Sequence, residues 1–417
     1  MFDRDAWQEI FATIKKNKLR TFLTCFGVYW GIFMLVIMLG AGNGLRNGIL
    51  AGFNGTATNS FFCWAQKTSK PYKGMKPGRS FNFTNDDFKA LRQLPELDII
   101  APMNRLGGYG SSNNVVRGLK TGNYQVSGVY PEVNQIEKVD LSEGRFLNYN
   151  DILQRRKVCI IGKRVREILF KPDENPLGDY IRVNGVYFRV IGVTKPTAGG
   201  QNGQEQSETV NIPFTTFQQA FNYGDVVGWF AVTAKNGVQA TEAEEKALAV
   251  LRERHKIAPE DQLAIGHWNM EKEFNKLSGL FSGIDILVWV VGTGTLLAGI
   301  IGVSNIMLII VKERTKEIGI RRAIGAPPAL IVRQIIIESV FLTAIAGYVG
   351  LVVSVSLLEL VSNAIPESDD SMFIHPGVDV SVALTALAIL IFAGALAGLI
   401  PARKAIAVSP VEALRAD

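Results

Sequence analysis

The residues that could carry chemistry in this chain do not form a familiar catalytic set. A phosphate-binding loop needs the pattern GxxxxGK[ST], but Gly162-Lys163 lacks the upstream glycine and is followed by Arg164. The HExxH and GxSxG motifs, typical of zinc proteases and serine hydrolases, do not occur in the 417 residues. We therefore expect a chain that is not an enzyme and that binds no cofactor or metal of its own.

The histidines and cysteines are scattered rather than clustered (His255, His267 and His375; Cys25, Cys63 and Cys159). His375 stands near acidic residues, but a solvated loop explains this grouping better than a metal site does. We expect Cys25 and Cys159 to be small buried hydrophobes. A Cys63–Cys159 disulfide stays open, since Cys63 would face an oxidising compartment.

A charged stretch between two apolar runs is the best candidate for a functional site. A helix starting at Glu313 would place apolar and charged residues on different sides (Ile320, Ala323 and Ile324; Glu313, Glu317 and Arg321). Glu317 precedes Arg321 by four residues, the favourable order for an ion pair. Because positive charge alone would suffice for membrane topology, the glutamates and the apolar stripe favour a helix that docks a partner and transmits force.

Four apolar runs, 22–41, 286–311, 339–358 and 381–400, are long enough to cross a hydrocarbon core. We interpret the first as a retained helix rather than a signal peptide, because its lead-in is long and no cleavage pattern follows. Pro401 would close the fourth. The runs are rich in small residues, which let membrane helices pack closely, on one another or on a second copy.

The formal net charge of +6 comes mainly from basic residues at the ends of these runs, which argues against nucleic-acid binding. Lysines and arginines precede the first run and fill 312–333, whereas the 363–380 loop is acidic. The positive-inside rule therefore predicts cytoplasmic termini and an outside location for 45–280. We expect a multi-pass membrane protein.

We predict an α-helical membrane protein with four transmembrane helices and an α+β extracytoplasmic domain between spans 1 and 2. The expected segments are an amphipathic helix (1–21, with Trp7, Ile10, Phe11 and Ile14 on one face), span 1 (22–44), the core domain (45–280), span 2 (281–311), a coupling-helix loop (312–329), span 3 (330–362), a short loop (363–379), span 4 (380–401) and a tail (402–417). Within the core domain, Asn184-Gly185 predicts a hairpin over 180–193, and we expect two subdomains.

Glu338 is a carboxylate at the edge of the third run. A buried acid in a membrane span is costly and suggests a functional role. Pairing with Arg333, or reaching out to the interface, explains it equally well, so both interpretations stay open.

The sequence resembles the MacB/FtsX-type family of ABC transporter permeases. The specific match is GVSNIML (302–308) followed by ERTKEIGIRRAIGA (313–326). Supporting matches are GRF (144–146), VCIIG (158–162), NPLG (175–178), FRVIGV (188–193), PARKA (401–405) and PVEALR (410–415). By this resemblance 313–326 is the coupling helix for the ATPase, with the candidate contacts Glu313, Arg314, Glu317, Gly319, Ile320, Arg321, Arg322, Ile324 and Gly325.

The resemblance implies a permease subunit of the bacterial inner membrane, paired with a second copy or a related permease, that a separate ATP- and Mg-binding ABC subunit drives. Force would pass through span 2 and 269–284 to the periplasmic domain. It further implies a periplasmic adaptor, an outer-membrane exit duct and efflux of drugs, toxins or peptides. A lipoprotein-releasing permease is one alternative. A signalling or scaffold protein that activates a cell-wall hydrolase or senses antimicrobial peptides is another.

Overall fold

The computed structural model describes residues 18–108, 110–364, 374, 376–378 and 380–407. The apolar face predicted over 7–14, most of the predicted 363–379 loop and the last ten residues of the tail lie outside the described residues. The chain divides into two units. We call Gly48–Gly279 the inserted domain, and the segments up to Asn47 and from Leu280 onward the membrane unit.

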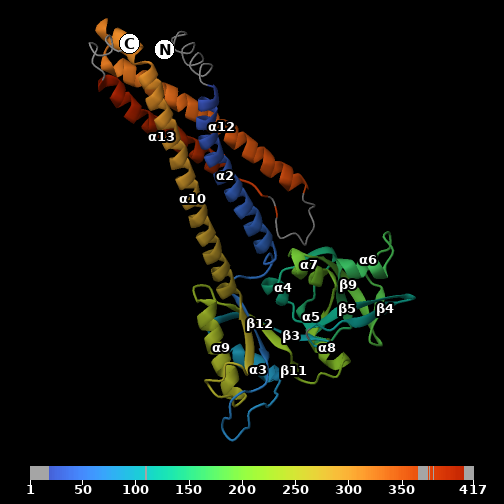
Figure 1. The fold of residues 1–417 in the computed structure, drawn as a ribbon. Helices are drawn as coiled ribbons and strands as arrows, with labels where there is room; N and C mark the ends of the chain where they lie inside the picture. The colour runs from blue at the N-terminus through green and yellow to red at the C-terminus, as the bar shows by residue number, and fades with distance from the viewer. Residues whose placement is uncertain (1–17, 109, 365–373, 375, 379, 408–417) are drawn as a thin grey trace. The chain divides into compact units, whose positions relative to one another are not determined.

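Four long helices carry the apolar runs (Figure 1): α2 (Lys18–Ala51), α10 (Met270–Glu313), α12 (Pro328–Ala364) and α13 (Val380–Ala407). Each is long and apolar enough to cross a membrane. The inserted domain lies between the first and second of these helices in the chain and mixes helices with strands. This confirms the predicted fold class and establishes a multi-pass membrane protein.

Two helix ends differ from the sequence prediction. α10 begins at Met270, eleven residues before the predicted start, because Asn269 accepts a hydrogen bond from the Lys272 backbone N–H at 3.0 Å and so caps the helix. Glu271 in the first turn also favours that start, since a carboxylate there complements the helix dipole. α13 continues through Pro401 to Ala407 instead of ending there, as membrane helices tolerate proline when neighbours satisfy the freed backbone groups.

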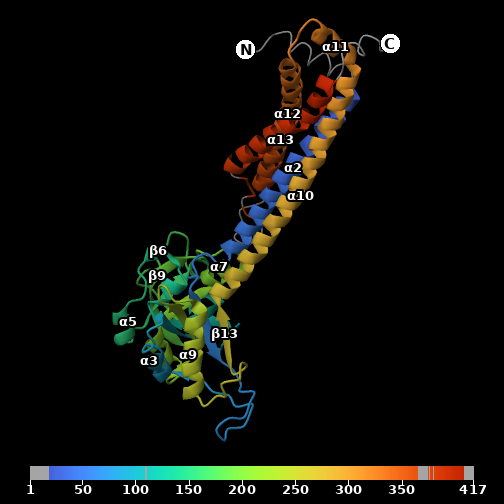
Figure 2. The same ribbon diagram turned by 90° about the vertical axis from the view of Figure 1, so that its left-hand side faces the viewer.

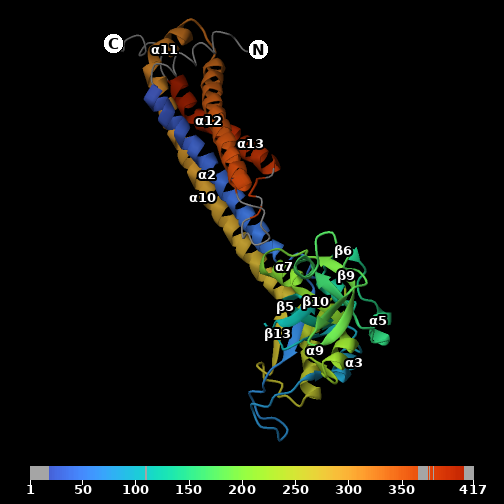
Figure 3. The same cartoon turned by 90° about the vertical axis from the view of Figure 1, so that its right-hand side faces the viewer.

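Small residues set the packing inside the membrane unit. Figures 2 and 3 both show α2 running beside α10. A Cβ at Gly299 of α10 would lie 3.2 Å from the carbonyl oxygen of Gly27 in α2, so these backbones touch almost directly. Between α12 and α13, the Ser339 hydroxyl donates to the Gly394 carbonyl at 2.8 Å. These seams explain why the runs are rich in glycine and serine.

Six strands of the inserted domain close into a barrel. β10 (Thr209–Pro213), β7 (Val158–Gly162), β9 (Val186–Lys195), β8 (Tyr180–Val183), β4 (Asn113–Arg117) and β5 (Lys120–Val129) pair in that order, and β5 pairs again with β10. Buried apolar residues from all six strands form its core. The predicted hairpin is confirmed as β8–β9, and Asn184 (φ 42°) and Gly185 (φ 90°) both have the positive φ that its turn requires.

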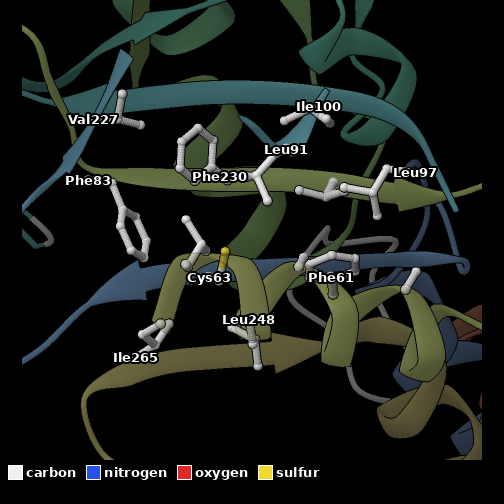
Figure 4. Packing of buried hydrophobic residues seen from close by; sticks show 14 of the residues in the cluster. Phe61, Cys63, Phe83, Leu91, Leu97, Ile100, Val227, Phe230, Leu248 and Ile265 are labelled. Carbon is white, nitrogen blue, oxygen red and sulfur yellow. The ribbon is translucent and has the colours of Figure 1, made fainter. Parts of the chain in front are cut away.

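The other half of the sheet is open. β3 (Leu97–Arg105) pairs with both β5 and β12 (Trp229–Ala234), and β1 (Ser60–Ala65) and β13 (Ile265–Asn269) follow. Helices α3 (Asn85–Leu91) and α9 (Ala240–Arg254) share its apolar cluster, where Figure 4 shows Phe61, Cys63 and Leu248. The barrel and the open half belong to one continuous sheet and are joined through β3, and the expectation of two subdomains stays a prediction. Cys63 and Cys159 are both free thiols, so the disulfide left open above is not formed.

The remaining short elements connect these parts. They are β2 (Phe83–Thr84), α4 (Val133–Ile136), β6 (Asp140–Gly144), α5 (Tyr149–Leu153), α6 (Lys163–Leu169), α7 (Gly200–Ser207), α8 (Phe214–Ala220) and β11 (Val226–Val227). β6 pairs with β9, and β11 forms a small second sheet with β2.

Candidate functional site

The charged stretch after α10 folds as a separate short helix, α11 (Thr315–Ala323), which joins α10 to α12 (Figure 2). Thr315 helps to end α10, because its hydroxyl donates to the Val311 carbonyl at 3.2 Å and to the Lys312 carbonyl at 2.8 Å. At the other end, Gly325 has a φ of 99°, which favours glycine. Its N–H donates to the Arg322 carbonyl, closing the helix in a Schellman-type cap.

The apolar residues of α11 divide between an inner and an outer face. Ile318 is 9% exposed and packs with apolar residues of α10 and α12. Ile320 and Ile324 point away from this core, with exposed fractions of 42% and 83%. Ala323 is exposed as well. The predicted stripe Ile320–Ala323–Ile324 therefore lies on the exposed side, while Ile318 anchors the helix.

Three arginines hold the inner face of α11 and its leading residue in place. Arg314 lies 3.3 Å from the Glu338 carboxylate of α12, and Arg321 donates to the Gln334 side chain at 3.0 Å. Arg322 donates to the Ile406 carbonyl of α13 at 2.6 Å. Hydrogen bonds to a charged group are stronger than those between neutral groups. α11 is thus bound by side chains to both α12 and α13 in addition to its short connections.

Two predicted pairings differ in the structure. No Glu317–Arg321 ion pair is present in the part of the chain that the structure describes, because Arg321 turns toward Gln334. Glu338, 2% exposed, is held by Arg314 rather than by Arg333. Glu338 therefore does form an ion pair, as one of the two interpretations expects, but its partner is Arg314. An arginine 24 residues away in sequence comes into reach only because α11 folds back on α12.

A cavity of about 30 Å³ lies between α10, α11 and α12, beside Arg314 and Glu338. A space of this size holds one or two water molecules and is far too small for a substrate. Among the described residues, no group of three or more histidine, cysteine or acidic side chains is placed to hold a metal. The site can fix a helix and present a surface; it does not enclose a ligand.

The structure places the predicted contacts of this site in distinct roles. Glu313, Glu317, Ile320 and Ile324 are exposed, Gly319 is buried beside Ile318, and Gly325 forms the cap. The three arginines are half-buried in the bonds described above. Sequence reasoning missed Gln334 and the Ile406 carbonyl as partners, since neither residue type nor spacing marks them.

Comparison with known protein families identifies two domains in this chain. The MacB-like periplasmic core domain matches residues 21–250, and the FtsX-like permease C-terminal domain matches residues 289–410. The chain is 29% identical to a pyoverdine export ATP-binding/permease protein, PvdT, of Pseudomonas putida, in an alignment covering 96% of this chain and 58% of that protein. It is 33% identical to a macrolide export ATP-binding/permease protein, MacB, of Chlorobaculum tepidum, with coverages of 98% and 60%.

The chain thus spans about 60% of the length of these curated relatives. Among solved structures, the periplasmic region of MacB from Actinobacillus actinomycetemcomitans aligns with 54% of this chain and 94% of its own, at 21% identity and a TM-score of 0.43. The two family domains together account for most of the sequence. The chain therefore belongs to the MacB/FtsX-type family of ABC transporter permeases.

Proposed function

We propose that this chain is a permease subunit whose α11 receives a separate ATP-hydrolysing subunit. The observation that carries the proposal is the exposed apolar face of α11, Ile320 and Ile324, on a helix whose opposite face is fixed to α12 and α13. Burying an exposed isoleucine side chain against a partner stabilises a complex by about 1.5–3 kcal/mol. Exposed Glu313 and Glu317 beside these residues add polar contacts at the rim of such an interface.

The side-chain bonds of α11 make it suitable for transmitting force. A partner that displaces α11 also displaces α12 through Arg314–Glu338 and Arg321–Gln334, and α13 through Arg322. α10 follows directly, since only Arg314 separates it from α11. The excess of basic residues in this segment supports a cytoplasmic location for α11 and both chain termini by the positive-inside rule, on the side where ATP is available.

The transport reaction that we propose is export from the periplasm. Support comes from the names of the relatives, which are export proteins for pyoverdine and macrolides. No phosphate-binding loop occurs in these 417 residues, and the binding of ATP and Mg is part of the proposed role of the partner subunit. We further propose a dimeric permease, a periplasmic adaptor, an outer-membrane duct, and drugs, toxins or peptides as the substrate class.

The test is co-purification of the ATPase from detergent-solubilised membranes, followed by ATP hydrolysis by the complex. Ile324→Asp should weaken ATPase binding by at least about tenfold, since it puts a charge where the proposed complex would bury an apolar side chain. Glu317→Lys should weaken it less, as an interface rim charge contributes little. Leu119→Asp, at a fully exposed position of the inserted domain, is the matched control and should leave binding unchanged. Recovery of folded wild-type chain without any ATPase would contradict the proposal.

A further inference from the structure

Glu244 is a buried carboxylate near the start of α9 that the function above does not use. Its side chain is 1% exposed, yet three polar groups surround it. Its oxygens lie 2.6 Å from His267 Nδ1 and 3.0 Å from Lys272 Nζ, and they accept a hydrogen bond from Asn269 Nδ2 at 2.8 Å. A buried charge is costly unless it is paired and hydrogen-bonded, so this site is built around Glu244.

The partners of Glu244 belong to the junction where the sheet becomes the membrane-crossing helix. β13 ends at Asn269 and α10 begins at Met270, with no loop between them. Both polar atoms of the Asn269 side chain form hydrogen bonds. Its Oδ1 caps α10 by accepting from the Lys272 N–H, and its Nδ2 donates to Glu244. Glu244 therefore fixes the orientation of the amide that starts α10.

A second bond joins the same two helices one turn away. The Thr241 N–H of α9 donates to the Glu271 carboxylate of α10 at 3.3 Å. α9 itself is firmly attached to the sheet, because Ala243, Ala247 and Leu248 are buried in the apolar cluster with strands β1 and β12. The first turn of α10 is thus clamped to a helix that moves with the sheet.

The opposite end of α9 contacts a second buried carboxylate, which belongs to another helix of the inserted domain and does not reach α10. Asp87 of α3 is also 1% exposed and bonds Arg254 Nε at 2.6 Å and His255 Nε2 at 2.8 Å. That network ties α3 to the end of α9 and includes no residue of α10. Asp87 thus provides a matched buried acid for separating coupling from general stability.

We infer that Glu244 couples α10 to the inserted domain, so that displacement of the helix moves the domain. Without Glu244, the chain connection at residues 269–270 and the Thr241–Glu271 hydrogen bond remain, and rotation about a few backbone bonds at that connection would absorb much of the motion of α10. The inference rests on the proposed function, in which α11 displaces α10. It adds the position at which that displacement becomes motion of the soluble domain, and Glu244 acts there as a positioning residue.

The experiment measures spin-label distances in the complex of the full chain with its ATPase, without nucleotide and after trapping with ATP and vanadate. Labels at Lys276→Cys on α10 and Leu119→Cys on the barrel, both highly exposed positions, report how the helix moves relative to the domain within one chain. Dilution with unlabelled chain removes distances between protomers. Leu119→Cys alone reports the separation of the two domains in the dimer.

The native cysteines do not interfere with this labelling. Cys63 and Cys159 are fully buried, and burial, with a smaller contribution from the Glu244 charge, raises the pKa of the Cys63 thiol to about 12. Cys25, which is half-buried, is replaced by serine in all variants.

In the wild type, trapping should change the domain-to-domain distance and leave the helix-to-domain distance fixed. In Glu244→Gln, trapping should change the helix-to-domain distance and leave the domain-to-domain distance fixed. The equilibrium between the coupled and uncoupled arrangements should shift about tenfold toward the uncoupled one, because one hydrogen bond to a charged group stabilises the coupled one by about that factor. Lys272→Met, at a half-exposed position, tests the same contact without altering the buried acid, and Lys272→Arg should restore coupling. Asp87→Asn should behave as the wild type.

Three results would overturn the inference. These are wild-type behaviour of both Glu244→Gln and Lys272→Met, loss of coupling in Asp87→Asn as well, and no change in the domain-to-domain distance of the wild type on trapping. Failure of the proposed function is distinguished from these by the absence of the ATPase from the purified complex.

Discussion

Replacing Arg314 by methionine removes an ion-pair partner of an almost completely buried carboxylate, that of Glu338. Arg314 and Glu338 lie 3.3 Å apart, with side-chain exposures of 22% and 3%. At that distance and an effective dielectric constant of about 20, their gross attraction is about 5 kcal/mol. Desolvation offsets much of this in the intact pair, but removal of Arg314 takes away attraction to the Glu338 carboxylate while the cost of burying that carboxylate remains. We expect Arg314→Met to lower the free energy of unfolding by about 3–5 kcal/mol.

The double variant Arg314→Met/Glu338→Met should be far less destabilised than Arg314→Met, because both charges are removed together. Unfolding is followed in micelles that mix a mild and a denaturing detergent, for the wild type, both single variants and the double variant. The difference between the summed single effects and the double effect gives the coupling energy of the pair. We expect about 2 kcal/mol or more, together with weaker ATP hydrolysis in the complex of the single variant.

A coupling energy within about 0.5 kcal/mol of zero would refute this reasoning, because independent sites add to within that margin. In that case the destabilisation of the double variant would equal the sum of the destabilisations of the two single variants. Lys316→Met, which removes an exposed cation from the neighbouring helix, is the matched control and should leave stability nearly unchanged.

Three further predictions concern backbone geometry and charge. Gly325→Ala should lower stability by about 1–2 kcal/mol because its φ of 99° is strained for alanine, and an unchanged thermal midpoint would contradict this. Gly299→Leu should separate α2 from α10, detected as a lower thermal midpoint, whereas Gly302→Leu, with open space around it, should not. Burial opposes ionisation of Asp87, but hydrogen bonds led by that from His255 outweigh it and lower its pKa from 3.8 to about 2. The carboxylate therefore stabilises the fold above about pH 4 by about 2 kcal/mol, and this is lost as the pH falls toward 2. Unfolding of the full chain across that range should show a flatter pH dependence for Asp87→Asn; parallel curves would disprove it.

Many elements of the fold could be predicted because their signals are local. Twenty uncharged residues in a row have few alternatives to a membrane helix, and Asn184-Gly185 between alternating strands leaves little choice but a hairpin. The ends of helices are harder to predict than the helices themselves. Asn269 and the acidic first turn mark the start of α10, but the apolar run beginning at Ile286 is the stronger pattern and masks them. Pro401 is a typical helix-ending residue, yet α13 continues through it to Ala407.

Sequence patterns alone predict the number of spans, the inserted α+β domain, the short charged helix and the family, since each depends on residues close together in the chain. The three-dimensional packing is needed to show which side of α11 is exposed, that Arg314 holds Glu338, and that Glu244 meets the first turn of α10. These contacts join residues about 24 and 28 positions apart. Local patterns fix how a segment folds, whereas packing selects which segments meet, and the cost of burying a charge makes each partner necessary without naming it.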